Sequence, residues 1–279
     1  MLGPAVKSHR RVAAALRRVL IIDPEPARAR LTGELLNEAC LPHIWTARTA
    51  AQATQLADEV DPDLIICEHA GTAFDGLSFT RSLRRSDMRC RKAPIVFVLQ
   101  RPTATLIVAA RDAGAHEFLR RPFTLRDLHR RLEAITLQPR NWVEAVDYVG
   151  PDRRRFNTAG HRGKLKRAAD NAAEPHDVRI AEAVKIIMSA VSAIDREPAQ
   201  ALRALLAQTE EVASVAEQTS DILLATGVAE LRRYLVEVSA GSAALTAAEI
   251  LRCASAFMDQ PSCRATKHSR REGTVAPFD

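Results

Sequence analysis

Short apolar runs alternate with amphipathic stretches along the first half of the chain. The runs are three to five residues long, and bulky aliphatic side chains fill most of them. The stretches between them carry apolar residues every three or four positions, which is the period of a helix that packs on one side. Continuous apolar strands are typical of a parallel sheet that helices cover on both faces. The expected strands are residues 19–22, 43–46, 64–67, 95–99 and 117–119.

A helix is expected after each of these strands, which gives five strand–helix units between residues 18 and 136. Five such units in about 120 residues predict an α/β fold, a flavodoxin-like, doubly wound sheet of five parallel strands. Functional groups in such sheets lie at the carboxyl ends of the strands, so the residues there are the first candidates for chemistry. The expected helices are residues 28–40, 50–60, 77–85, 105–113 and 125–135.

The pattern changes on both sides of this domain. Residues 1–17 are interpreted as a basic N-terminal arm, and residues 137–176, which are rich in arginine, as a basic and partly extended linker. Helical periodicity returns over residues 177–260, where we expect a helical interaction domain, a small all-α bundle of roughly four helices. Residues 261–279 are polar and basic, and we expect them to form a disordered tail.

Charge and cysteine usage narrow the class of protein. The net charge of +6 permits anionic partners but identifies none of them. The five cysteines are widely spaced and form no C-x-x-C motif, so neither a disulfide framework nor a zinc site is indicated. Reduced cysteines fit a cytoplasmic protein. No apolar run approaches the ~20 residues of a membrane helix, so no membrane span is expected.

Three landmarks follow one another in order along residues 18–136. They are the strand that ends in Asp23, the strand that ends in Cys67-Glu68 and precedes Asp75-Gly76, and the segment that runs from Asp112-Ala113-Gly114 to Arg121-Pro122-Phe123. In their order and spacing they resemble the CheY-like receiver domain of response regulators in two-component signalling. The chain looks like a degenerate member of that family, followed by a helical domain that resembles no family we recognise.

The resemblance implies a specific chemistry for an intact receiver. An aspartate on the third strand accepts a phosphoryl group, and acidic residues after the first strand hold Mg²⁺. A hydroxyl on the fourth strand and a lysine on the fifth contact the phosphoryl oxygens. The metal ion offsets the charge on the transferring group and aligns it for attack.

This chain departs from that pattern at almost every position. Glu68 stands in place of the nucleophile, and its extra methylene moves the carboxylate by about 1.5 Å, a displacement to which in-line transfer is sensitive. Asp23 remains of the acidic pair, but Pro24 follows it and cannot bind a metal. Leu99 replaces the hydroxyl and Arg121 the lysine. We therefore expect a degenerate phosphoacceptor pocket with no catalytic residue, no Mg²⁺ and no other cofactor.

The same positions give two expectations about packing. Glu68 and Arg121 carry opposite charges, so we expect them to pair and to hold the domain near one conformation without phosphorylation. The alternative is that both are solvated residues at strand ends. Phe118 falls at the family's switch aromatic, and because Leu99 offers no hydroxyl, we expect Phe118 to act by packing alone.

The most unusual local sequence lies in the linker. A Pro-Asp pair predicts a turn before Arg153, Arg154 and Arg155. Arginine forks suit phosphates, and some arginine-rich receiver tails resemble binders of cyclic-di-GMP, so these residues are a candidate anion-binding site. The alternative is a linker that folds back onto acidic surface of the receiver. Nucleic acid is not expected, since no helix-turn-helix follows and aromatic residues do not interleave with the basic ones.

These observations predict a non-catalytic protein of two-component or phosphorelay signalling, a pseudo-receiver that acts as an adaptor or regulator. Its expected partners are a kinase, a phosphotransferase or an assembly protein. The resemblance also implies a homodimer through residues 105–113 and 125–135. Two alternatives stay open: an effector that binds cyclic-di-GMP, and a conventional phosphorylated response regulator. No enzyme is expected, because the sequence shows no nucleophile–base pair, metal-ligand cluster or glycine-rich phosphate loop.

Overall fold

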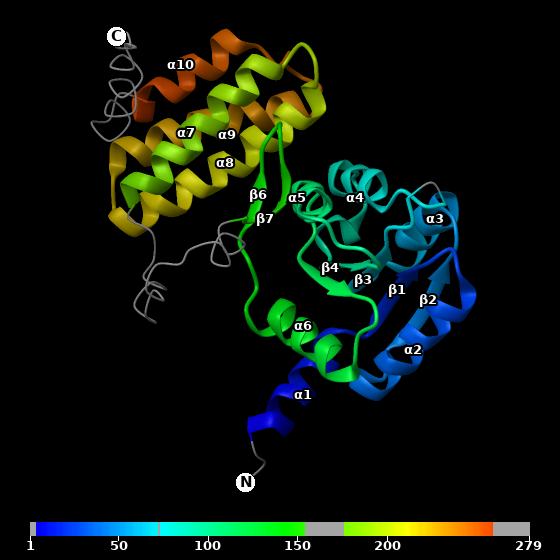
Figure 1. The fold of residues 1–279 in the computed structure, drawn as a ribbon. Coiled ribbons are helices and arrows are strands. Elements are labelled where there is room, and N and C mark those ends of the chain that lie inside the picture. Colours follow the sequence, from blue (N-terminus) through cyan, green and yellow to red (C-terminus); the bar gives the residue numbers. More distant parts are fainter. Residues whose placement is uncertain (1–3, 72, 154–175, 259–279) are drawn as a thin grey trace, which may run out of the picture. The chain divides into compact units, whose positions relative to one another are not determined.

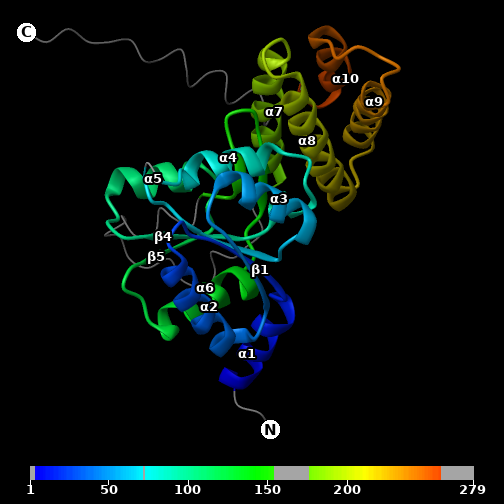
Figure 2. The same ribbon diagram turned by 90° about the vertical axis from the view of Figure 1, so that its right-hand side faces the viewer.

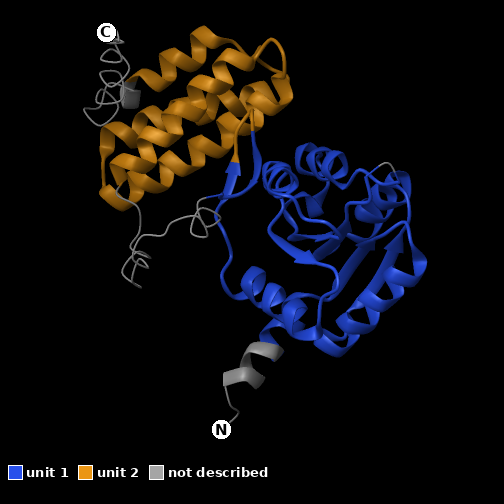
Figure 3. Cartoon of the chain, viewed as in Figure 1, with its two compact units in different colours: residues 1–143, 148–160 blue, residues 144–147, 161–279 orange. Residues whose placement is uncertain are grey.

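The computed structural model describes residues 4–71, 73–153 and 176–258. The chain forms two compact units (Figure 3). Unit 1 contains the described residues up to Val143 together with residues 148–153, and unit 2 contains residues 144–147 and the described helices from His176 onward. All the candidate site residues that the structure describes lie in unit 1.

Unit 1 is built on a parallel sheet of five strands in the order β2-β1-β3-β4-β5 (Figure 1). Neighbouring strands run in parallel register, with Ile21 opposite Ile66 and Cys67 opposite Phe97. Strands β1 and β3 lie side by side and present their carboxyl ends to the same edge. The predicted flavodoxin-like fold is therefore confirmed. The strands are β1 (Arg18–Ile22), β2 (His43–Ala47), β3 (Leu64–Glu68), β4 (Ile95–Leu99) and β5 (Glu117–Arg120).

Helices cover both faces of this sheet, α2 and α6 on one face and α3, α4 and α5 on the other (Figures 1 and 2). Four of them begin at a side chain that accepts a hydrogen bond from a backbone N–H of the first turn: Thr49, Asp75, Thr103 and Thr124. Such caps satisfy donors that have no partner within the helix. The elements are α2 (Pro26–Cys40), α3 (Ala50–Val60), α4 (Gly76–Arg85), the 3₁₀ helix η1 (Arg89–Lys92), α5 (Ala104–Asp112) and α6 (Leu125–Leu137).

Strand side chains sort into two cores, one on each face of the sheet, because successive residues of a strand point to opposite faces. Ile21 and Ile66 pack with Leu36 of α2, whereas Cys67 and Phe97 pack in the opposite core. Every residue of β3 and β4 is buried. This burial explains why both strands are apolar throughout, except for Glu68 at the end of β3.

An N-terminal helix, α1 (Pro4–Ala15), belongs to unit 1. Val12 and the following Leu16 are fully or almost fully buried, in the same core as Leu36 of α2 and Leu132 of α6. Part of the stretch interpreted as a basic arm therefore contributes to the core of the folded unit. The four-residue spacing of Val12 and Leu16 is the sequence signal for this packing.

A two-stranded hairpin, β6 (Trp142–Glu144) and β7 (Val149–Pro151), lies within the stretch predicted to be a partly extended linker. Its stem belongs to unit 1. It lies next to Arg84 and Gly114 of the same unit, where the buried Arg84 donates from Nε and Nη2 to Gly114 O at 3.2 and 2.9 Å. The Arg84 guanidinium also lies 5.3 Å from the centre of the Trp142 ring. A Cβ on Gly150 would come within 2.8 Å of the Gly114 Cα, so the backbones meet closely at this point.

Unit 2 is helical, as predicted. Its core joins apolar residues from all four of its described helices, among them Ile187, Leu205, Leu231 and Ile250. Helix α8 has Pro198 at its start, where the missing N–H of proline costs nothing. None of the helices in the described segments combines the length and the apolar character needed to cross a bilayer. The helices are α7 (His176–Ala193), α8 (Pro198–Thr219), α9 (Ile222–Ser239) and α10 (Ala247–Met258).

The tip of the hairpin, residues 144–147, is part of unit 2. Val146 is buried in the helical core. Gln200 Nε2 donates to Glu144 Oε1 at 3.1 Å, and Gln208 Nε2 donates to the Glu144 carbonyl at 3.2 Å. The helical unit therefore includes a segment that comes far earlier in the sequence than its helices.

Candidate functional site

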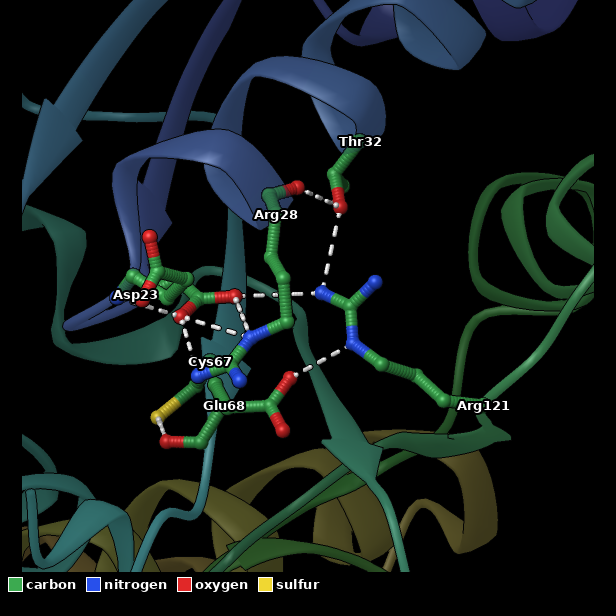
Figure 4. A network of polar contacts seen from close by, with 7 residues as sticks. Asp23, Arg28, Thr32, Cys67, Glu68 and Arg121 are labelled. Atoms are coloured by element: carbon green, nitrogen blue, oxygen red, sulfur yellow. Dashed lines mark hydrogen bonds and ion pairs between the residues drawn. The ribbon is translucent and has the colours of Figure 1, made fainter.

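Two acidic side chains meet where β1 and β3 end. Asp23 directly follows β1 and Glu68 is the last residue of β3, and each residue is 1% exposed. A buried carboxylate is costly unless opposite charges and hydrogen bonds compensate it. Two arginines supply both kinds of compensation here (Figure 4).

The first of these arginines is Arg121, in the segment after β5. Its backbone N–H donates to the Leu99 carbonyl at 3.0 Å, and the Arg121–Pro122 peptide bond is cis. Its Nε lies 3.0 Å from Glu68 Oε2, and its Nη2 lies 3.1 Å from Asp23 Oδ2. The structure thus contains the ion pair expected between Glu68 and Arg121, and the same guanidinium also holds Asp23.

The second arginine, Arg28, was not among the residues that the sequence singled out. It lies in the first turn of α2, where Nη2 donates to Asp23 Oδ1 at 3.0 Å and Nε lies 3.3 Å from both carboxylate oxygens. The hydrogen bond to Asp23 is the largest cause that raises the pKa of Arg28. A cation in the first turn opposes the helix dipole at a cost of about 0.3–1 kcal/mol. An arginine placed there, directly after an acidic strand end, is the signal that would have identified it.

Thr32 connects the two arginines (Figure 4). Its hydroxyl donates to the Arg28 carbonyl at 3.0 Å and accepts from Arg121 Nη2 at 3.4 Å. Thr32 is 1% exposed. The pocket is therefore a continuous network of four charged side chains and one hydroxyl, drawn from β3, α2 and the segments after β1 and β5.

Burial works against the negative charge of Glu68. Burial raises the pKa of its carboxyl above the usual value, while the hydrogen bond and the charge of Arg121 act in the opposite direction. Its second oxygen, Oε1, is buried and has no hydrogen-bond partner within the described part of the chain. A proton on Oε1 would leave the Arg121 contact at Oε2 intact, so this carboxyl can be neutralised without breaking the network.

The remaining pocket positions named from the sequence are apolar. Leu99 is 1% exposed, and the half-buried Phe118 packs against the core cluster that contains Leu99. Leu99 leaves no hydroxyl at the end of β4 with which to bind a phosphoryl oxygen. Phe118 therefore packs against this core, and its role as a residue that acts by packing alone stays a prediction.

The residues present do not fit the Mg²⁺ that the receiver resemblance implies. Mg²⁺ requires several oxygen ligands in near-octahedral geometry. Asp23 Oδ1 already accepts from the backbone N–H of Glu25 at 2.9 Å and from Arg28, and Oδ2 accepts from Arg121. Within the described segments, no group of three or more His, Cys, Asp or Glu side chains is placed to hold a metal ion.

The arginine cluster after the hairpin is described only in part. Arg153 Nη1 lies 3.1 Å from Asp112 Oδ1, and its guanidinium stacks 3.5 Å from the centre of the Tyr148 ring. Arg153 therefore contacts an acidic residue of its own unit. Arg154 and Arg155 lie outside the described residues, so a cyclic-di-GMP site at these three positions stays a prediction.

The fold and the pocket together define an α/β domain with a charged site at the carboxyl edge of its parallel sheet. The model of the response regulator receiver domain matches residues 19–133, and this part of the chain belongs to that family. The chain therefore contains the receiver domain of a two-component response regulator. Receiver domains work by contact with signalling partners.

Two relatives from Mycobacterium tuberculosis illustrate the similarity. The transcriptional regulatory protein PdtaR is 32% identical over 133 residues, which are 48% of this chain and 62% of PdtaR. The transcriptional regulatory protein TrcR is 28% identical over 135 residues, 48% of this chain and 51% of TrcR. The chain thus spans about half to three fifths of the length of these relatives.

Solved receiver structures were matched as well. The chemotaxis protein CheY4 of Vibrio cholerae is 21% identical, with a TM-score of 0.40, over 43% of this chain and 99% of CheY4.

Proposed function

We propose that the chain is a pseudo-receiver, a non-catalytic adaptor or regulator of two-component or phosphorelay signalling that acts without phosphorylation. Its receiver would signal through protein contacts, with a kinase, a phosphotransferase or an assembly protein as the partner class. The helical unit would serve as a second interaction domain. The observation that carries the proposal is the internal ion-pair network of the pocket.

The network opposes phosphoryl transfer in two ways. The carboxylate at the acceptor position, Glu68, is bound to Arg121 at 3.0 Å, and its buried Oε1 has no donor among the residues that the structure describes. A nucleophile held by a cation inside the protein is poorly placed for in-line attack on an incoming phosphorus. The charges that would attract a metal ion are also already balanced, since two carboxylates face two guanidinium groups.

Surface features of the receiver support a role in protein contacts. Ile107 and Val108 on α5 are 37% and 45% exposed, so this helix presents two apolar side chains to solvent. Exposed apolar surface of this kind favours a protein partner or a second copy of the chain.

Incubation with acetyl phosphate and Mg²⁺ tests the proposal. The unmodified chain should show no added phosphoryl group in its intact mass, because Glu68 is paired with Arg121 and the described segments contain no metal-ligand cluster. A positive control is the fivefold variant Pro24→Asp, Arg28→Gln, Glu68→Asp, Leu99→Thr, Arg121→Lys. It restores the residues that the family resemblance implies and removes the guanidinium that occupies Asp23. A phosphoryl group on Glu68 or Asp23 of the unmodified chain would refute phosphorylation independence.

A further inference from the structure

We infer that the guanidinium of Arg28 is a built-in substitute for the metal ion, and that it excludes divalent cations from the carboxylates at the end of β1 and β3. The inference rests on the proposed function, because it supplies the reason why the pocket holds together without a metal. It concerns a positioning residue and involves no chemical step.

Arg28 is placed as the counter-ion of Asp23, because its guanidinium contacts both carboxylate oxygens. Its Nη2 and Nε approach Asp23 at 3.0 and 3.3 Å and engage both carboxylate oxygens. Asp23 is 1% exposed, whereas the Arg28 side chain is 31% exposed. The partly exposed cation therefore shields the buried acid from solvent.

Arg121 alone does not balance the pocket. Its guanidinium is shared, with Nε on Glu68 and Nη2 on Asp23. With Arg28 present, the two carboxylates and two guanidinium groups sum to zero charge. Without Arg28, the group carries one net negative charge, and Asp23 Oδ1 keeps only the Glu25 backbone donor among its described contacts.

The N-terminus of α2 explains why the arginine can hold this position. Arg28 follows Pro26, the first residue of the helix, and the capping residue Glu25 makes no side-chain cap. The Thr32 hydroxyl, one turn further on, binds the Arg28 carbonyl at 3.0 Å. The local helix geometry thus fixes the backbone from which the guanidinium reaches back over Asp23.

Mn²⁺ titration of the full chain tests the inference, with free Mn²⁺ measured by its electron paramagnetic resonance signal. No phosphoryl donor is added, so failure here is distinguishable from failure of the proposed function. The unmodified chain should leave the Mn²⁺ signal unchanged. Arg28→Gln should bind one Mn²⁺ with a dissociation constant on the order of 1 mM, at least about tenfold tighter than the unmodified chain.

Further variants test whether Mn²⁺ binding depends on the charge at position 28 and on the carboxylate of Asp23. Arg30→Gln, an exposed arginine of the same helix that pairs with Glu34 at 3.0 Å, should behave like the unmodified chain. Arg28→Lys, which keeps a cation, should also exclude Mn²⁺, and Arg28→Ala should admit it. Asp23→Asn in the Arg28→Gln background should abolish binding.

Three results would overturn the inference. They are Mn²⁺ binding to the unmodified chain, no binding by either neutral variant when circular dichroism shows native helix content, and binding that survives Asp23→Asn. The measurement on the unmodified chain stands by itself, so the inference can be refuted even if the neutral variants fail to fold.

Discussion

At the scale of single residues, the pocket is defined by charges that compensate one another inside the protein. Removing one partner of a buried ion pair costs more than the pair contributes, because the remaining charge keeps its desolvation penalty. Glu68 depends on Arg121 in this way, since its other oxygen has no partner within the described segments. The receiver should therefore be sensitive to loss of Arg121.

Arg121→Ala should lower the free energy of unfolding of the receiver by about 3 kcal/mol at neutral pH. Both tryptophans, Trp45 and Trp142, lie in unit 1, so urea unfolding followed by tryptophan fluorescence measures this unit selectively. Glu68→Gln in the Arg121→Ala background should recover much of the loss, because it leaves no unpaired charge on Glu68. If Arg121→Ala and the double variant Arg121→Ala, Glu68→Gln lost the same free energy of unfolding, this account of the pocket would be contradicted.

The effect of Arg121→Ala should also depend on pH in a definite direction. Burial raises the pKa of Glu68, and loss of Arg121 should raise it further. A carboxyl whose pKa is raised by folding destabilises the fold when it is ionised and not when it is protonated. The deficit should therefore be largest at neutral pH, begin to shrink as the pH falls through the raised pKa, and be small below the ordinary Glu value of about 4.3.

At the scale of elements, α1 acts as part of the receiver core rather than as an appendage. Val12→Ala should cost about 2 kcal/mol, because it removes buried methyl groups that contact α2 and α6. Arg11→Ala, an exposed neighbour on the same helix, is the control and should change stability by less than about 0.5 kcal/mol. Tryptophan fluorescence in urea checks both; equal stabilities of Val12→Ala and the unmodified chain would show that α1 contributes no packing energy.

Elements were predictable from the sequence where the hydrophobic period was sustained. The strands and helices of the receiver are buried on regular faces, so their patterns are unambiguous. The hairpin over residues 142–151 was not predicted as such, because Glu144 and Asp147 interrupt its apolar residues. Arg84 was not predicted as a buried residue. Its guanidinium donates to backbone carbonyl oxygens, and every residue type has such an oxygen, so the sequence does not indicate these partners.

At the scale of the whole molecule, the helical unit extends beyond the segment that its helical pattern suggests. Val146→Ala should destabilise unit 2 by about 2 kcal/mol, since Val146 is buried in its core. Hydrogen–deuterium exchange of the α8 amides measures this unit directly and should speed up. The control is Asp147→Ala, an exposed neighbour in the same tip, and unchanged exchange in Val146→Ala would place the tip outside the helical core.

The order of landmarks along the chain was enough to predict the fold of the receiver and to single out three members of the charged network, Asp23, Glu68 and Arg121. It was not enough to reveal how the charges are distributed among them. Asp23 was expected only as a remnant, yet it is the residue that both arginines share. Such sharing depends on the directions of side chains from three separate segments, which spacing along the sequence does not encode.

The contact between Arg28 and Asp23 determines where the cation that neutralises Asp23 comes from. A dissolved ion occupies its site according to its concentration, whereas a group tethered to the same chain has a fixed effective concentration set by the intervening residues. These two residues are five positions apart in the sequence. If Arg28 excludes divalent cations as inferred above, the chain itself supplies the cation at Asp23, and the occupancy of that carboxylate does not follow the magnesium concentration of the surroundings.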